Sequence, residues 1–400
     1  MGCSGGMQSA TLTRPGLDWR AWGVLVAVST ARFAFGYQLQ TVASLRPDLA
    51  QAFGLDFAGL GSLVGAYMLP GIAAALLLGF AAQRFGDRAV LACGFLLMTL
   101  GSLGAGAADS FAALAASRAL AGTGAVALTV LQSKVLADRF AGGLFMIALG
   151  VMLGLFPIGI GTGQLAHAPV AAAFGWHAAF LAGAAPAALS LVLLLVSWRD
   201  SASAPPRSMS WPSRDECKQV ILAGLVWTFY TGGFITFLTY TPSLLAEYGE
   251  PRWVTNLVMN LATWGNLPAI LFGGAVAAKF GNHRVFIVGM VLAVACVAAM
   301  PLLDWPLLLG AVYGTIGAMH GTVIVGTGTL SARPQYRAVG MALFYTVYYV
   351  GSSVFPAICG RAADLAGDPA GAFYCGAALS AFAFPAWWLH RRRAARLAAA

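Results

Sequence analysis

The sequence GFAAQRFGDR at residues 79–88 returns in altered form as GAVAAKFGNHR at residues 274–284. Each copy ends a long apolar run and places a basic residue, a phenylalanine and a glycine in succession. The two copies set Gly86 and Gly281 195 residues apart, close to half the length of the 400-residue chain. This spacing indicates that the chain consists of two related halves.

A second pair of segments supports the same division. LFPIGIG at residues 155–161 matches VFPAICG at residues 354–360, and here the equivalent prolines are 199 residues apart. Two matches at nearly one offset predict a duplicated unit joined by the polar, Pro/Ser-rich segment 198–218. Internal duplication of this kind is typical of secondary carriers.

The composition places these halves in a membrane. Hydrophobic residues make up 59% of the chain, charged residues only 9%, and the mean hydropathy is +0.78. A soluble domain carries about 25% charged residues. The six cysteines are scattered without a CxxC pair, so the sequence predicts neither a disulfide framework nor a metal site. The class is therefore an all-α integral membrane protein.

Twelve apolar runs are long enough to cross about 30 Å of hydrocarbon as helices. They fall at residues 21–44, 57–81, 89–108, 111–137, 142–165 and 173–197, and then at 218–242, 254–278, 285–303, 305–330, 338–362 and 371–390. We therefore expect two pseudo-symmetric bundles of six transmembrane helices. The predicted parts are an N-terminal tail 1–20, a bundle 21–197, a linker 198–217, a bundle 218–390 and a basic tail 391–400.

The distribution of basic residues predicts the orientation. An even number of spans puts both termini on one side, and Lys and Arg concentrate on the cytoplasmic side of membrane proteins. The segments on the side of the termini hold 18 of the 23 basic residues. Only Arg46, Arg252 and Arg361 lie at the opposite ends, while Arg32 and Arg118 lie inside spans. Both termini are predicted to be cytoplasmic, and the surplus charge needs no nucleic-acid partner.

These features resemble the major facilitator superfamily, whose loop between helices 2 and 3 carries G-x-x-x-D-R-x-G-R-R. Four residues fit this pattern, namely Gly79, Arg84, Gly86 and Arg88. Gln83 stands where the family has Asp, and Asp87 where it has a base. The resemblance implies that this loop, with Lys279 and Gly281 in the second copy, belongs to the gate between the halves. Gln83 removes the charged component of that gate.

Span 111–137 is similar to the family pattern R-x-x-x-G-x-G through Arg118, Gly122 and Gly124. Residues 36–71 and 134–142 look most like the branch of cyanate and nitroimidazole transporters. Helices 1, 4, 7 and 10 line the central cavity in this family, so the resemblance implies a substrate site between the halves near mid-depth.

Arg32 is the strongest candidate for substrate contact. It lies near the middle of the first span, where a charge costs roughly 2.5 to 3.5 kcal/mol on insertion scales and usually serves a function. Gln40 follows close to the same helix face. All fourteen acidic residues fall in loops or at span ends, so two arginines in the membrane lack a carboxylate partner. This favours an anion as substrate, although an arginine bonded to helix carbonyls remains the structural alternative.

Other candidates come from polar and aromatic residues in later spans. His320 is the histidine that the predicted spans place at mid-depth, where it is a candidate for carrying a coupled proton. Arg118 and Asn260 are further polar candidates, and Tyr230, Trp264 and Tyr345 are aromatic candidates for the cavity wall. Aromatic residues at helical spacing also pack one helix against another, so these residues either line the cavity or serve only in packing.

The sequence predicts a secondary active transporter of a small organic or inorganic anion in the bacterial inner membrane, working as a monomer by alternating access. No phosphate-binding loop or catalytic set is found, so neither an enzyme nor a cofactor is expected. A proton-linked exporter of neutral or weakly basic drugs is the alternative, and a membrane sensor is a third. The direction of transport, the coupling ion and the substrate itself stay open.

Overall fold

The computed structural model describes residues 19–198, 211–333 and 336–399. The predicted tail 1–20 and linker 198–217 lie for the most part outside these residues. Within them 88% of the chain is helical, and no strand is formed. The two sets of helices that the duplication predicts are both present, and each is given below with its bounds.

The first half consists of α1 (Trp19–Ser44), α2 (Arg46–Phe53), α3 (Phe57–Met68), α4 (Gly71–Phe85), α5 (Asp87–Gly106), α6 (Phe111–Ala137), α7 (Gly142–Phe174), α8 (Trp176–Ala182) and α9 (Ala184–Ser197). The second consists of α10 (Arg214–Glu247), α11 (Arg252–Trp264), α12 (Asn266–Phe280), α13 (Asn282–Ala299), α14 (Pro306–Gly314), α15 (His320–Leu330), α16 (Arg337–Ala366), α17 (Ala370–Ala381) and α18 (Ala383–Ala399). Several crossings are thus made of two helices in succession.

Ten helical stretches of the described chain are long and apolar enough to span a membrane. The remaining two predicted crossings are α1, whose hydropathy is lowered by Arg32 and two glutamines, and the pair α14 and α15. That pair is interrupted at residues 315–319, within the glycine-rich sequence GTIGAMHG. The predicted all-α fold of membrane-spanning helices is confirmed, and ten of the twelve predicted crossings are found as helical stretches long and apolar enough to span a membrane.

The C-terminal end of α7 differs from the sequence prediction. The apolar pattern predicts that the fifth crossing ends at residue 165, but α7 continues to Phe174 with Pro157 and Pro169 inside it. Proline is tolerated in membrane helices because neighbouring helices and side chains satisfy the freed backbone groups. The longer helix places His167 inside the bundle, where it is fully buried. His320 is therefore not the one deeply placed histidine.

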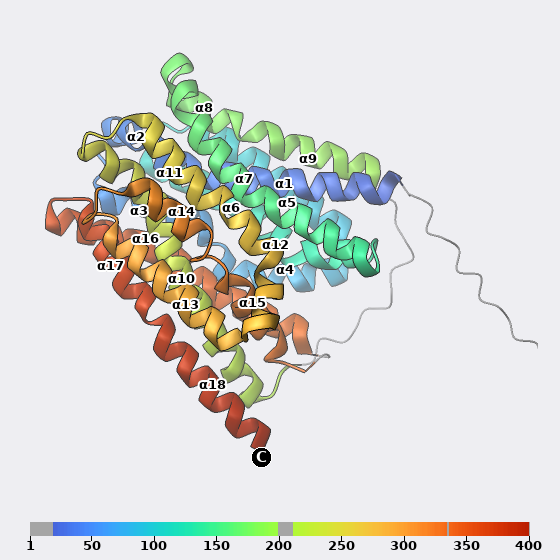
Figure 1. Ribbon diagram of the computed structural model, residues 1–400. Helices are drawn as coiled ribbons and strands as arrows, with labels where there is room; N and C mark the ends of the chain where they lie inside the picture. The colour runs from blue at the N-terminus through green and yellow to red at the C-terminus, as the bar shows by residue number, and fades with distance from the viewer. Residues whose placement is uncertain (1–18, 199–210, 334–335, 400) are drawn as a thin grey trace, which may run out of the picture.

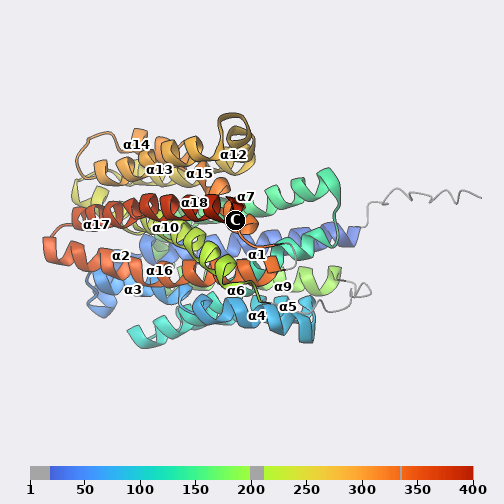
Figure 2. The same ribbon diagram turned by 90° about the horizontal axis from the view of Figure 1, so that it is seen from below.

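The halves meet along α3 and α16, which approach closely because glycines face backbone. A Cβ added to Gly61 would overlap the carbonyl of Pro356, and one added to Gly65 would overlap the carbonyl of Ser353. Small residues allow such close approach of membrane helices. Figure 2 shows α16 running beside α3 between the two halves.

The two halves are in contact at one end and diverge toward the other. In Figure 1 the helices lie together at the left, while α1 and α9 of the first half and α18 of the second run apart to the right and to the bottom. The start of α1 and the end of α18 lie at the end where the halves diverge. The basic residues predict that this end is cytoplasmic.

Candidate functional site

Arg32 lies on α1 and faces α6 and α7. Its Nη1 donates a long hydrogen bond of 3.4 Å to Oγ1 of Thr129. The guanidinium carbon lies 4.7 Å from the ring centroid of Phe156 and 5.2 Å from that of Phe35. Such cation–π contacts hold an arginine without neutralising its charge. The charge of Arg32 is therefore positioned by neutral groups.

The partner half places a row of phenols opposite this charge. Tyr345, Tyr348 and Tyr349 of α16 lie in the neighbourhood of Arg32, as does Tyr67 of α3. Arg32, Tyr345 and Tyr348 are half-buried, whereas Tyr67 and Tyr349 are buried. Among the residues that the structure describes, no carboxylate lies within 4.0 Å of the Arg32 guanidinium. Its Nε is buried without a hydrogen-bond partner.

Aromatic rings extend this site along the second half. The ring centroid of Trp227 on α10 lies 5.4 Å from that of Tyr230 and 6.4 Å from that of Tyr348. Tyr345 in turn lies 6.3 Å from Tyr348 and 5.4 Å from Phe344. The predicted residue Tyr345 therefore lies in the neighbourhood of Arg32, and the predicted residue Tyr230 lies beyond Tyr348 and Trp227. The aromatic spacing of the spans also indicates Trp227 and Tyr348 as residues of the cavity wall, whereas it does not indicate Tyr349.

Arg118 occupies a different place, inside the first half. Its Nε donates to the carbonyl of Leu63 at 3.3 Å and its Nη1 to the carbonyl of Gln38, while its guanidinium lies over the ring of Tyr67. Only 2% of the residue is exposed. The structure therefore places Arg118 where it joins α1, α3 and α6 through backbone groups.

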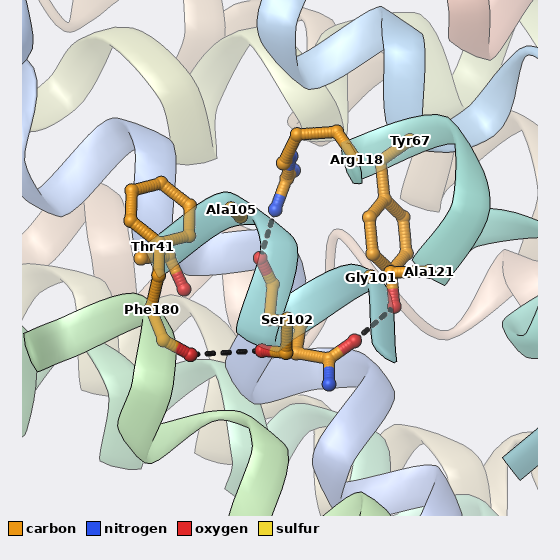
Figure 3. A pocket seen from close by; sticks show the side chains of 9 residues that line it. Thr41, Tyr67, Gly101, Ser102, Ala105, Arg118, Ala121 and Phe180 are labelled. Carbon is orange, nitrogen blue, oxygen red and sulfur yellow. Dashed lines mark hydrogen bonds between the residues drawn. The ribbon is translucent and has the colours of Figure 1, made fainter. Parts of the chain in front are cut away.

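A small enclosed space lies beside Arg118. Figure 3 shows the residues around it, including Ser102, whose hydroxyl donates to the carbonyl of Phe180 at 2.8 Å. Its volume of about 10 Å³ is at the lower limit for a single water molecule. The space is too small for a substrate, and Arg118 Nη2 is buried without a hydrogen-bond partner beside it.

Gln40 belongs to a chain of amides at the end where the halves meet. Its Nε2 donates to Oε1 of Gln164 at 2.8 Å, and Gln164 donates across the interface to Oδ1 of Asn256 at 3.1 Å. Only 1% of Gln40 is exposed. The spacing on the helix predicts a face shared with Arg32, but the amide chain joins Gln40 to α7 and α11.

Asn260 and Trp264 lie at the same interface between α7 and α11. A Cβ added to Gly161 would overlap Asn260 Oδ1 and Trp264 Nε1. Asn260 Nδ2 donates to the carbonyl of Asn256 at 2.8 Å, and its Oδ1 has no hydrogen-bond partner. These two predicted residues therefore lie in the contact that closes the halves at this end.

The two deep histidines have similar aromatic surroundings. His320 begins α15, and its ring lies edge-on to Tyr230, with centroids 4.3 Å apart. Both of its ring nitrogens are buried without a hydrogen bond. His167 lies edge-on to Tyr37 at the same distance of 4.3 Å, and its Nε2 is 3.2 Å from Oγ1 of Thr41. Each histidine is thus packed against a tyrosine of its own half.

The duplicated loop has the same backbone in both copies. Gly86 between α4 and α5 has φ +85°, and Gly281 between α12 and α13 has φ +87°. Gln83, Arg84 and Lys279 are exposed beside them. The glycines at these two positions end one helix and begin the next, in a conformation that side chains rarely adopt.

Asp87 has a structural partner within the same half. Lys134 Nζ lies 2.6 Å from its Oδ2 and 2.9 Å from its Oδ1. The acid that replaces a basic residue of the family pattern therefore joins α5 to α6. Arg88 donates to the carbonyl of Leu195 at 3.4 Å, which adds α9 to the same contact region.

The opposite end holds the polar contacts that join the two halves. The Asp364 carboxylate on α16 accepts the backbone N–H groups of Phe57 at 2.9 Å and Ala58 at 3.0 Å. The Tyr240 hydroxyl donates to the carbonyls of Pro356 at 2.6 Å and Phe57 at 3.1 Å. The structure is thus closed at the end predicted to face outward.

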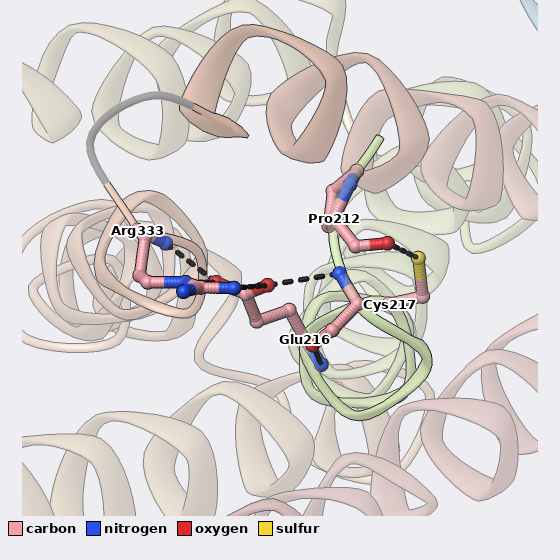
Figure 4. A network of polar contacts seen from close by, with 5 residues as sticks. Pro212, Glu216, Cys217 and Arg333 are labelled. Atoms are coloured by element: carbon pink, nitrogen blue, oxygen red, sulfur yellow. Dashed lines mark hydrogen bonds and ion pairs between the residues drawn. The ribbon is translucent and has the colours of Figure 1, made fainter. Parts of the chain in front are cut away.

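At the predicted cytoplasmic end the corresponding contacts lie within the second half. Figure 4 shows Arg333, which precedes α16, bound to the Glu216 carboxylate at the start of α10. Glu216 also forms a capping box with Ser213, which explains why α10 begins before the predicted residue 218. Asp215 pairs with Arg393 of α18. These pairs tie the helices of the second half to one another at this end.

Comparison with solved structures shows the fold. A bacterial homolog of the human lysosomal transporter Spinster, described as inward-facing and unoccupied, matches with a TM-score of 0.73 at 16% identity, covering 94% of this chain and 98% of that one. A mutant form of the nucleoside transporter NupG matches with a TM-score of 0.73 at 13% identity, covering 94% and 99%.

Curated relatives extend over most of the sequence. The 3-(3-hydroxy-phenyl)propionate transporter of Escherichia coli K12 is 27% identical over 350 residues, which cover 82% of this chain and 83% of the relative. The 4-hydroxybenzoate transporter PcaK of Pseudomonas aeruginosa is 24% identical over 303 residues, covering 66% and 68%. The family model of the Major Facilitator Superfamily matches residues 28–356 and 254–399. The chain belongs to the Major Facilitator Superfamily and is a secondary transporter of a small solute in a membrane.

Proposed function

We propose that the protein transports a small organic anion, and specifically an aromatic carboxylate, through a site formed by Arg32 and the tyrosines of α16. The observation that carries this proposal is the unneutralised guanidinium of Arg32 at the junction of the two halves. A guanidinium binds a carboxylate through two parallel hydrogen bonds. The substrate would supply the negative charge that this part of the chain lacks.

The rings opposite Arg32 support the aromatic part of the proposal. Tyr345 and Tyr348 are half-buried and adjoin Trp227, so a ring attached to the carboxylate would stack on them. Phenol groups also offer hydrogen bonds to a ring hydroxyl. Two of the curated relatives are named as transporters of 3-(3-hydroxy-phenyl)propionate and 4-hydroxybenzoate, which are aromatic acids.

Substrate binding would couple to closure through charge. In the present arrangement the halves diverge on the side predicted to be cytoplasmic, and Arg32 keeps part of its surface exposed. Bringing the halves together would desolvate an unpaired cation, which is costly in a membrane. A bound anion pairs with the guanidinium and lowers that cost, so closure would follow occupancy.

Further parts of the proposal concern setting and coupling. We expect the protein to lie in the bacterial inner membrane, to work as a monomer, and to have His320 as a candidate for carrying a coupled proton. The small anions suggested by the cyanate-like branch remain alternative substrates. A drug exporter in which Arg32 has only a structural role is the second transport function to be tested.

Ligand-induced stabilisation of the purified protein distinguishes these functions. The test ligands are 4-hydroxybenzoate, 4-hydroxybenzyl alcohol as its uncharged counterpart, cyanate, nitrate and a lipophilic cationic drug. A ligand that binds only the folded state at a hundredfold excess over its Kd stabilises by about 2.7 kcal/mol. We expect the carboxylate to stabilise the wild type, and Arg32→Gln to abolish this effect while Arg32→Lys retains part of it.

Transport by the same variants completes the experiment. Uptake of radiolabelled 4-hydroxybenzoate into proteoliposomes should be lost in Arg32→Gln. Equal stabilisation by the alcohol and the carboxylate would contradict the proposal that the site binds an anion. Stabilisation by cyanate or nitrate alone would replace the aromatic substrate with a small inorganic anion, and stabilisation by the drug alone, unchanged in Arg32→Gln, would establish the exporter.

A further inference from the structure

The last helix, α18, has two faces with different surroundings. One face is attached to the second half: Trp387 Nε1 donates to His283 Nδ1 at 3.1 Å, and Gln219 Nε2 donates to the His390 carbonyl at 3.0 Å. One turn later Arg393 pairs with Asp215. These contacts hold α18 in a definite rotation relative to the bundle over nearly two turns.

The opposite face presents an aromatic and basic stripe. Trp388, Arg392 and Arg396 are spaced four residues apart and thus lie above one another along the helix. Trp388 is 54% exposed, and the Arg392 guanidinium lies 4.3 Å from its ring centroid. Arg392 and Arg396 are exposed, and among the described residues neither has a carboxylate within 4.0 Å.

The position of this stripe suits the boundary between lipid chains and headgroups. Apolar residues precede it on α18, and exposed Leu389 lies beside Trp388. Tryptophan prefers the membrane interface, and arginines just beyond it reach the phosphate layer. Asp215, the acidic group that contacts α18, is already paired with Arg393. The guanidinium groups of the stripe are therefore available to anions from outside the chain.

We propose that Trp388, Arg392 and Arg396 form a docking surface for anionic phospholipids of the leaflet on the side that the basic residues predict to be cytoplasmic. The phosphodiester of a lipid accepts hydrogen bonds from the two guanidinium groups, and its chains pack against Trp388 and Leu389. Bound lipid stabilises α18 and, through Arg393, His390 and Trp387, the starts of α10 and α13. This property is independent of the transported substrate.

The experiment titrates the detergent-purified full-length protein with phosphatidylglycerol in mixed micelles and follows its thermal unfolding. Phosphatidylcholine, which has no net charge, and inorganic phosphate are titrated in parallel. We expect phosphatidylglycerol to raise the unfolding midpoint more than phosphatidylcholine. The half-saturating lipid fraction should rise about tenfold in Arg392→Gln/Arg396→Gln, because each interfacial arginine contributes to attraction by an anionic surface.

Two further variants make the result specific. Arg252→Gln/Arg361→Gln removes the same charge from exposed positions at the opposite end and should respond as the wild type does. Arg392→Lys/Arg396→Lys retains the charge and should keep most of the effect. Equal half-saturation in all four proteins overturns the proposal, and an equal shift with inorganic phosphate assigns the surface to a free anion in place of a lipid.

Discussion

The carboxylate of Asp364 accepts the backbone N–H of Phe57 at 2.9 Å, although 307 residues separate them. Asp364 lies near the end of α16 in the second half, and Phe57 begins α3 in the first. The first N–H groups of a helix have no partner inside the helix, and a carboxylate there is stabilised by the helix dipole. One half of the molecule thus caps a helix of the other at the end that is closed.

We expect Asp364→Asn to shift the protein toward an arrangement that is open at this end. A hydrogen bond to a charged group contributes roughly 1.5 to 3 kcal/mol. The population ratio of the open to the closed arrangement should therefore rise about tenfold or more. Spin labels at Gln51 of α2 and Glu247 of α10, both exposed, would report the separation of the halves as a distance distribution.

Asp368→Asn is the matched control for this measurement. Asp368 accepts the backbone N–H of Ala370 at 2.7 Å, within the second half. Its substitution removes the same charge four residues further along the chain without touching the first half. A change of the distance distribution in both variants alike would show that Asp364 does not act as a link between the halves.

Arg118→Gln should lower stability without changing ligand affinity. The substitution removes two buried hydrogen bonds from a charged donor, to the carbonyls of Leu63 and Gln38, and each bond of this kind contributes roughly 1.5 to 3 kcal/mol. Thermal unfolding and a binding isotherm for the transported anion measure the two effects separately. Arg32→Gln should show the reverse pattern. Loss of affinity with unchanged stability in Arg118→Gln would place Arg118 in the binding site.

Gly36→Ala should destabilise the first half. A Cβ at this position would overlap the carbonyl oxygen of Phe156, where α1 and α7 lie in contact, and overpacking typically costs about 1 to 3 kcal/mol. Gly274→Ala in α12 is the control, since a Cβ there meets nothing within 4 Å. Unfolding midpoints of the purified variants check this prediction, and similar midpoints for both would contradict the close packing of α1 and α7.

Gly86→Ala and Gly281→Ala should have similar costs because the two loops share one backbone conformation. At φ near +85° an alanine is strained by roughly 1 to 3 kcal/mol, although nothing crowds its Cβ at either position. Both unfolding midpoints should therefore fall below that of Gly79→Ala, a helical glycine with equally open space. A cost at only one of the two loops would argue against their structural equivalence.

Local sequence was sufficient for much of the fold. Hydropathy over about twenty residues specifies a crossing, so the twelve crossings could be predicted. The repeat around Gly86 and Gly281 could be recognised because each loop depends on a glycine in its own helix junction. Arg32 stood out for the same reason, since an arginine inside an apolar run is anomalous whatever its neighbours are.

The partners of these residues could not be predicted in this way. Hydropathy does not specify the rotation of each helix or the pairing of one helix with another, which depend on close packing over the whole molecule. The tertiary structure directs Arg118 to backbone carbonyls, joins Gln40 to Gln164, and sets the tyrosines of α16 opposite Arg32. It also buries His167, because α7 continues past the end that the apolar run predicts.

The sequence by itself determined that this protein is a bundle of membrane helices, duplicated along the chain, with two arginines inside its spans. Which groups surround each arginine, and which end of the molecule is closed, only the tertiary structure decided. The physical reason is distance along the chain: the hydrogen bond of Asp364 to α3 and the placement of the α16 tyrosines near Arg32 bring together segments some 300 residues apart, and no local pattern records them.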